Sequence, residues 1–174
     1  MTSKWTLPTI ISQYPEADAE NFHISWLETD NFAGLKTLDK ISVRTTHDLV
    51  HIARDPRHDI LQKTYYLKIT GFDFSTFTGP VTGIEMRMTM NRGGRITDDT
   101  VQLCLGNKTI GKNLASLPIP PVKVYGGDSD TWENKLSVTD IQDPTFGITL
   151  RFQSHPMWPH KSSPLIDAVE LRIH

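Results

Sequence analysis

Side chains with binding chemistry are densest in residues 154–161, where His155, Met157, Trp158 and His160 stand together with two prolines. The prolines stiffen this segment, and a large indole ring is costly to leave in water. Three interpretations are open for Trp158. It stacks on a sugar ring, it anchors a protein interface, or it folds over the edge of the domain's own core.

Trp132 and Trp5 are the other aromatic candidates for a ligand or an interface. Trp132 follows a Gly-Gly turn and is expected to cover the edge of the fold or to act as a second stacking platform. Asp128 and Asp130 lie in the same turn and are weak candidates for calcium ligands. A DxD pair without the glutamate and spacing of a known calcium loop more often forms an Asx turn.

Motifs for catalysis and for a resident metal are missing from the sequence. His47 and His51 would share one face of a helix, but the glutamate of the zinc-protease motif does not lie between them. There is no nucleophile elbow, phosphate loop or dinucleotide fingerprint. Cys104 stands between two leucines and is predicted to be a buried, inert thiol. We therefore expect a non-enzymatic protein without a cofactor.

The composition disfavours two classes of partner, nucleic acid and anionic membranes. The 174 residues suit one domain, and 18 basic and 20 acidic side chains give a net charge of −2. A balanced charge disfavours nucleic acid and anionic membranes as partners. The sequence shows no secretory signal and no apolar run of membrane-spanning length, so we expect a soluble protein made in the cytoplasm without a signal peptide.

Apolar and polar residues alternate from about residue 64 onward, which is typical of half-buried strands. The clearest run is Ile84–Met90, and residues 101–105, 148–152 and 169–173 repeat its period of two. Glycine, proline, asparagine and aspartate separate these runs. The sequence predicts one all-β domain over residues 1–174, an antiparallel, jelly-roll-like β-sandwich.

The first 63 residues are less regular than the strand-rich part from residue 64 to 174. Residues 22–27 and 38–43 are possible strands, and residues 46–60 fit either a short helix or a looped strand, because Pro56 interrupts both. In the strand-rich part, charged residues that face away from the core are expected to form weak cross-strand pairs on a solvated sheet face. They are Glu85, Arg87, Arg151, Glu170 and Arg172.

Short motifs follow one another along nearly the whole chain. They are WTLP (5–8), YLKITGFDFS (66–75), VTGIEMR (81–87), DDTVQL (98–103), GKNLA (111–115), YGGDSDTW (125–132), TDI (139–141) and FGI (146–148). In this order they resemble a family of small β-sandwich proteins found among the structural genes of tailed bacteriophages and prophages. The chain departs from the family pattern at Glu133, where glycine is common, and in longer stretches at 44–63 and 155–164.

The resemblance implies a component of the virion and no reaction. Such a protein docks on capsid, neck or tail proteins as a decoration or attachment element, in many copies or as a homo-oligomer. Its position on the particle does not follow from the family. The alternative function is a carbohydrate-binding module that stacks a surface glycan on Trp158 or Trp132, for instance in receptor binding by a tail or fibre.

Overall fold

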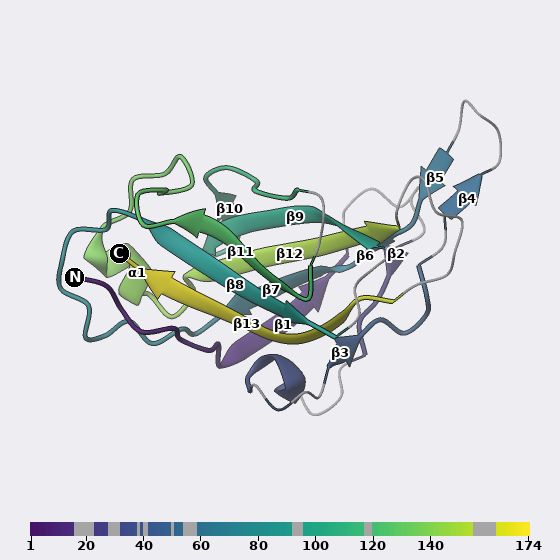
Figure 1. Cartoon of the computed structure of the whole chain (residues 1–174), viewed down its shortest axis with the longest axis horizontal. Coiled ribbons are helices and arrows are strands. Elements are labelled where there is room, and N and C mark those ends of the chain that lie inside the picture. The colour runs from purple at the N-terminus through teal and green to yellow at the C-terminus, as the bar shows by residue number, and fades with distance from the viewer. Residues whose placement is uncertain are drawn as a thin grey trace.

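The computed structural model describes residues 1–15, 23–27, 32–37, 39, 42–49, 51–53, 59–91, 96–116, 120–154 and 163–174. Over these residues the chain forms two β-sheets that pack against each other (Figure 1). The described residues are almost all β, with a single α-helix of five residues, so the predicted all-β sandwich is confirmed.

The smaller sheet has four antiparallel strands. Their order is β11 (Val122–Gly127), β8 (Ile84–Met90), β13 (Leu165–Ile173) and β3 (Val43–Arg44). The larger sheet runs in the order β1 (Ile10–Tyr14), β7 (Tyr66–Thr70), β12 (Gly147–Ser154), β9 (Ile96–Leu105) and β10 (Lys108–Ile110). Two short strands extend it beside β12, namely β6 (Lys63–Thr64) and, parallel to it, β2 (His23–Ile24).

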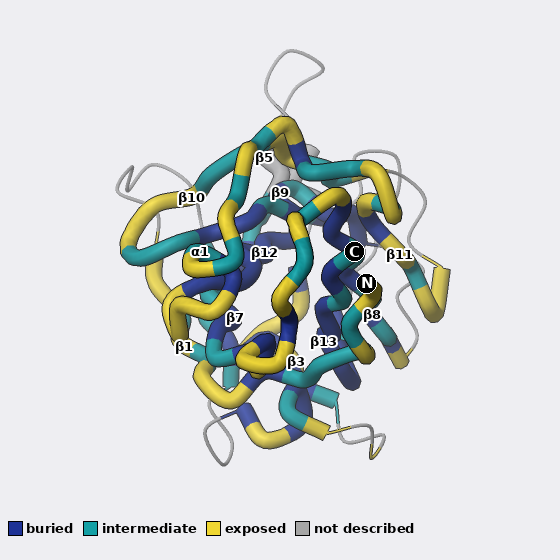
Figure 2. The backbone as a smooth tube through the Cα atoms, turned by 90° about the vertical axis from the view of Figure 1, so that its left-hand side faces the viewer, coloured by how far each residue is buried: buried dark blue, intermediate teal, exposed yellow. Residues whose placement is uncertain are grey.

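The period of two predicted for β8 is present in the structure. Ile84, Met86, Met88 and Met90 are buried, and the residues between them are partly exposed. Apolar side chains of β9, β12 and β13 fill the same core, and Figure 2 shows these strands as the buried centre of the molecule, beneath exposed loops. Burial of this apolar layer is the main stabilising term of the fold.

Strand β12 is buried on both of its faces. Ile148 and Leu150 point into the core, yet Thr149 and Arg151 are also almost inaccessible. Both faces are covered because β12 lies in the interior of the sheet, where it pairs with β7 and β6 on one side and β9 on the other. Side chains of the neighbouring strands therefore cover its outer face as well.

The N-terminal segment connects the two sheets. Thr6 exchanges backbone hydrogen bonds with Leu171 of β13, and after the buried Pro8 the chain enters β1 of the larger sheet. The two chain ends thus lie close together at one end of the sandwich (Figure 1). The backbone groups of β13 that pair with the N-terminal segment are therefore not left unpaired at a sheet edge.

The first 63 residues contribute to the same core. Trp26, Phe32, Leu35 and Leu49 belong to the buried apolar cluster, and the Gln13 side chain bonds both the N–H and the carbonyl of Trp26. Among the described residues of the strand expected at 22–27, β2 covers His23–Ile24, and β3 (Val43–Arg44) begins at the last residue of the strand expected at 38–43.

The described residues of the range 46–60 contain no helix, which was one of the two structures that the sequence left open. Instead β4 (His51–Ala53) and β5 (Asp59–Leu61) pair as an antiparallel hairpin that stands apart from the sandwich (Figure 1). A short 3-10 turn, η2 (Ala33–Leu35), lies beside β13 and β3.

One short helix, α1 (Val138–Gln142), precedes β12 and was not expected from the sequence. Ser137 accepts the N–H of Asp140, and Asp140 accepts the N–H of Ser137, which forms a capping box. Ile141 anchors the helix in the core. The signal S-x-x-D was present in the sequence but did not precede an apolar run of helical period.

Two glycines are required by close contacts with other parts of the chain. A Cβ on Gly147 would lie 2.0 Å from the Ile69 carbonyl oxygen. Gly126 has a φ of +77°, and its Cβ would lie 2.1 Å from the Ile84 oxygen and 2.5 Å from Trp132 Nε1. The turn before Trp132 therefore needs glycine for both its conformation and its space.

Replacement of Gly126 tests this contact. Gly106 is a matched control, since its φ is +61° but a Cβ there meets nothing within 4 Å. Gly106→Ala should lower the free energy of unfolding by about 1 kcal/mol through backbone strain alone. Gly126→Ala should lower it by at least ~3 kcal/mol, because a clash is added. Urea unfolding measures both values, and equal losses would contradict the packing described here.

Candidate functional site

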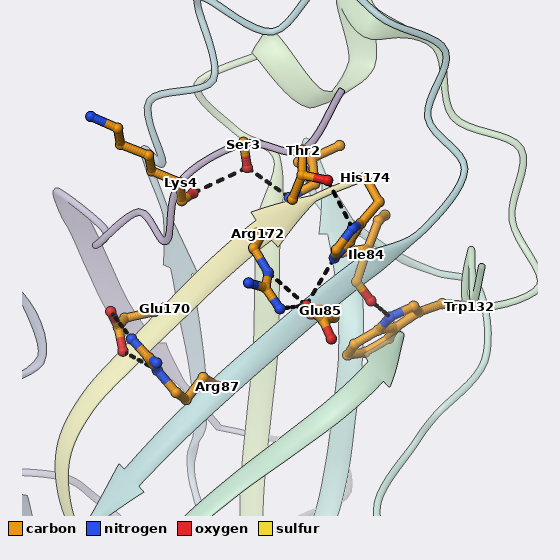
Figure 3. A network of polar contacts seen from close by, with 11 residues as sticks. Thr2, Ser3, Lys4, Ile84, Glu85, Arg87, Trp132, Glu170, Arg172 and His174 are labelled. Atoms are coloured by element: carbon orange, nitrogen blue, oxygen red, sulfur yellow. Dashed lines mark hydrogen bonds and ion pairs between the residues drawn. The ribbon is translucent and has the colours of Figure 1, made fainter. Parts of the chain in front are cut away.

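Trp5 lies on the outer face of the smaller sheet, against two arginines. The guanidinium carbons of Arg87 and Arg172 each stand 4.4 Å from the centre of its ring. Both arginines are held by carboxylates on the neighbouring strand, since Arg87 bonds Glu170 through two nitrogens and Arg172 bonds Glu85 (Figure 3). This arrangement uses the ring of Trp5 to fasten the N-terminal segment onto the sheet.

Glu85 also ties the C-terminus to this cluster. His174 Nε2 lies 2.8 Å from Glu85 Oε2, and His174 Nδ1 lies 3.3 Å from the Thr2 hydroxyl (Figure 3). Burial acts to raise the pKa of Glu85, but the bonds from His174 and Arg172 outweigh it and hold that pKa below its ordinary value.

The cross-strand charge pairs predicted from the sequence exist, but their face is only partly solvated. The side chains of Arg87 and Arg172 are 30% and 31% exposed, whereas those of Glu170 and Glu85 are 5% and 15% exposed. As a whole residue Glu170 is 4% exposed, and Arg87, which bonds it, lies against the Trp5 ring of the N-terminal segment. Arg151 was expected on the same face, and the structure assigns it to the larger sheet. These pairs are therefore part of the packing of the fold, where loss of one partner costs more than at an exposed surface.

The outer face of the larger sheet carries a row of stacked side chains. Tyr14 of β1 pairs with Tyr66 of β7, and their rings stack with centroids 5.1 Å apart. The Arg151 guanidinium lies 4.2 Å from the Tyr66 ring centre on the next strand. Asp99 of β9 then accepts Arg151 Nε at 2.5 Å and Lys63 Nζ at 2.9 Å. The row thus runs from edge strand β1 across β7 and β12 to β9.

A second row runs beside the first and forms the floor of a groove. Register places Ser12, Lys68 and Thr149 side by side on β1, β7 and β12. The groove has a volume of about 450 Å³, and its lining also includes Tyr14 and the turn between β9 and β10. That volume is in the range of small-molecule sites.

Lys68 crosses the floor of this groove. Its Nζ donates to the Gly106 carbonyl oxygen and lies 3.4 Å from Asn107 Oδ1. Among the residues that the structure describes, no carboxylate forms an ion pair with it. In the described part of the chain, the ammonium group of Lys68 is therefore bonded to neutral oxygen atoms alone.

Two ionisable groups in the groove are shifted by burial. Desolvation raises the pKa of Cys104 to about 11, against the opposing effects of Thr149 and Lys68. Desolvation also raises the pKa of Tyr14, and the neighbouring Thr149 opposes that shift. Both groups are therefore neutral near pH 7. The predicted burial of Cys104 is confirmed, at 2% exposure.

The structure removes Trp132 from the set of surface candidates. Its side chain is 0% exposed, and its indole N–H donates to the Ile84 carbonyl at 2.9 Å (Figure 3). Asp130, in the same turn, accepts the Trp132 N–H at 2.7 Å, which is the Asx turn predicted as the alternative to a calcium site. Trp132 covers one end of the sandwich from within and presents no face to a ligand.

Four of the other predicted site residues lie outside the described residues, namely His155, Met157, Trp158 and His160. Trp5 is described and half-buried, and its ring is engaged by arginines of the same chain. Tyr14 and Lys68 were not predicted as site residues, because each is an ordinary residue in a short alternating run and sheet register is what brings them together.

Within the described residues no group of three or more histidine, cysteine, aspartate or glutamate side chains could hold a metal ion. His51 lies in β4, so it does not share a helix face with His47. None of the helices in the described part of the chain has the length and apolar character needed to cross a bilayer.

The Asp99 network gives a prediction for stability. Desolvation opposes ionisation of Asp99, but Lys63 and Arg151 hold its pKa below the ordinary value. Asp99→Asn should lower the free energy of unfolding by about 3 kcal/mol at pH 7, because Arg151 stays buried without its partner. A depressed folded-state pKa stabilises above the unfolded value, so the difference from wild type should shrink as the pH falls below about 4.

Urea titrations at several pH values measure that difference. Glu133→Gln is the control, because the Lys112–Glu133 pair is largely exposed and its loss should change stability by less than ~0.5 kcal/mol. A loss for Asp99→Asn that stays constant down to pH 3 would contradict the assignment.

Cys104 gives a second prediction. At pH 8 a pKa of about 11 leaves roughly one thiol in a thousand ionised, and the sulfur is buried. An aromatic disulfide reagent should therefore label the native protein very slowly and the urea-unfolded protein within seconds to minutes. The time course of released thiolate measures this, and rapid labelling in native buffer would show that Cys104 is accessible.

Comparison with known proteins adds no relative: no protein family, no curated protein and no solved structure matches this chain.

Proposed function

We propose that this chain is a non-enzymatic structural protein of a tailed-bacteriophage virion, which docks on capsid, neck or tail proteins. The observation that carries the proposal is the ordered set of motifs from residue 5 to residue 148, which resembles a phage structural family. The all-β sandwich is the fold that this resemblance implies.

The motif residues have structural roles that a shared fold would require. Gly83 leaves no room for a Cβ, which would lie 2.3 Å from the Gly127 oxygen, and Gly126 gives space to Trp132. Asn113 accepts the Val101 N–H and donates to the Asp99 carbonyl, so it fixes the GKNLA segment to β9. A resemblance concentrated at such positions supports common ancestry of the sandwich more than a chance match of composition.

Both sheets offer edges suited to docking. In the smaller sheet, Val122 and Val124 on edge strand β11 are 52% and 48% exposed. In the larger sheet, Ile10 and Tyr14 on edge strand β1 are also exposed. Apolar side chains on an edge strand favour pairing with another chain. Such pairing repeated around a symmetric particle supports assembly in many copies.

Composition of the particle tests the proposal. Mass spectrometry of gradient-purified particles from the bacterium or phage that encodes this chain should detect on the order of tens of copies or more per particle, because symmetric assemblies repeat each subunit. Capsid and tail proteins in the same sample supply the internal standard. Absence of the chain from intact particles would overturn the proposal.

Incorporation should depend on the β11 edge. The double substitution Val122→Glu and Val124→Glu places two negative charges there, and we expect at least tenfold less chain per particle because charged edges resist pairing. Lys135→Glu is a control with the same net change in charge at another exposed position. Circular dichroism of the purified variants verifies the fold. Equal incorporation of all three proteins would assign docking to a different surface.

A further inference from the structure

The groove on the outer face of the larger sheet has the form of a ligand site. It crosses the strands from Ser12 and Tyr14 on β1 to Thr109 on β10, over a floor that includes Lys68 and Thr149. Its residues come mainly from strands, and these hold their side chains in fixed positions. A site on a rigid sheet loses little conformational entropy when a ligand binds.

One wall of the groove is an aromatic ring. Tyr14 uses one ring face for its stack on Tyr66, and the residue still has 37% of its surface exposed. Tyr66 is fixed in turn by Arg151, which Asp99 holds in place. An aromatic ring of this kind, fixed from behind, offers an apolar surface for the C–H face of a pyranose.

The remaining lining is hydrogen-bonding and positively charged. Ser12, Asn107 and Thr109 present hydroxyl and amide groups that match the donors and acceptors of sugar hydroxyls. Lys68 and Lys108 add two cations, and the described lining contains no carboxylate. A partly buried ammonium without an ionic partner favours an anion in this space.

We propose that this groove binds an acidic sugar, a pyranose that carries a carboxylate, of the kind found in bacterial surface polysaccharides. The carboxylate lies at Lys68, the ring stacks against Tyr14, and the hydroxyls bond the turn between β9 and β10. A peptide carboxylate would satisfy Lys68 but would leave the aromatic wall and the neutral polar groups unused. The inference goes beyond virion assembly, and it can be tested on the isolated chain.

Binding of matched monosaccharides tests the site. The probes are the methyl glycosides of glucuronic, galacturonic and N-acetylneuraminic acid, and the controls are methyl glucoside, methyl galactoside and sodium acetate. In a ¹⁵N heteronuclear NMR titration, at least one acidic glycoside should shift the amide signals of residues 12–14, 68 and 106–109. Its dissociation constant should be roughly tenfold lower than that of its neutral counterpart, the factor expected from one charge-assisted hydrogen bond.

Variants separate charge from stacking. Lys68→Met should abolish the preference for the acid, and Lys68→Arg should retain it, because only the first variant removes the cation. Tyr14→Ala should weaken the acidic and the neutral sugar alike, whereas Tyr14→Phe should preserve both. Lys112→Met is the control, because Lys112 pairs with Glu133 and does not line the groove. The NMR spectrum of each free variant verifies that it is folded.

Three results would overturn the inference. They are the absence of shifts with all three acidic glycosides, equal affinity for an acid and its neutral counterpart, and equal affinity for acetate, which would make the groove a simple anion site. None of these results bears on whether the chain is found in particles. Failure of the sugar site and failure of the proposed function are therefore distinguishable.

Discussion

The pairing of β12 with neighbours on both sides determines how the rest of the molecule is arranged. Residues 147–150 of β12 pair with β7 and β9 at once, so every backbone group there has a partner and both faces lie under other side chains. The inner face closes the core with Ile148 and Leu150. The outer face aligns Tyr66 with Arg151 and Lys68 with Thr149. A shift of one residue in this register would exchange the two faces and remove both the core and the groove.

The sequence was sufficient to predict the strands whose two faces differ in polarity. In β8 the apolar residues are buried and Glu85 and Arg87 lie outside, so the period of two is visible without the structure. The sequence did not predict how far the outer faces of the sheets are buried, because that burial depends on partners distant in the chain. Glu170 is buried, and its partner Arg87 lies against Trp5, a residue far from both in the sequence. Local alternation identifies which side chains share a face, but not what covers that face.

The same limit explains the outcome for the site residues. Trp132 was predicted as a surface candidate because it is a large aromatic residue beside a turn. In the structure its ring is buried, and its indole N–H donates to the Ile84 carbonyl. Tyr14 and Lys68 were not predicted as site residues, because a tyrosine and a lysine in short strands are common. Their relation arises from the register of β1 on β7, which places Ser12 opposite Lys68 and Tyr14 opposite Tyr66. No pattern in the sequence specifies that register before the sheet forms.

The two open edges differ in their relation to the groove. Strand β1 is both an edge of the larger sheet and the strand that carries Tyr14, so a chain that paired with β1 would cover or move the aromatic wall. Strand β11 belongs to the other sheet and contributes no residue to the groove lining. Docking through β11 would therefore leave the groove accessible, whereas docking through β1 would compete with a ligand there. If the chain both assembles and binds a sugar, β11 is the edge that allows the two at the same time.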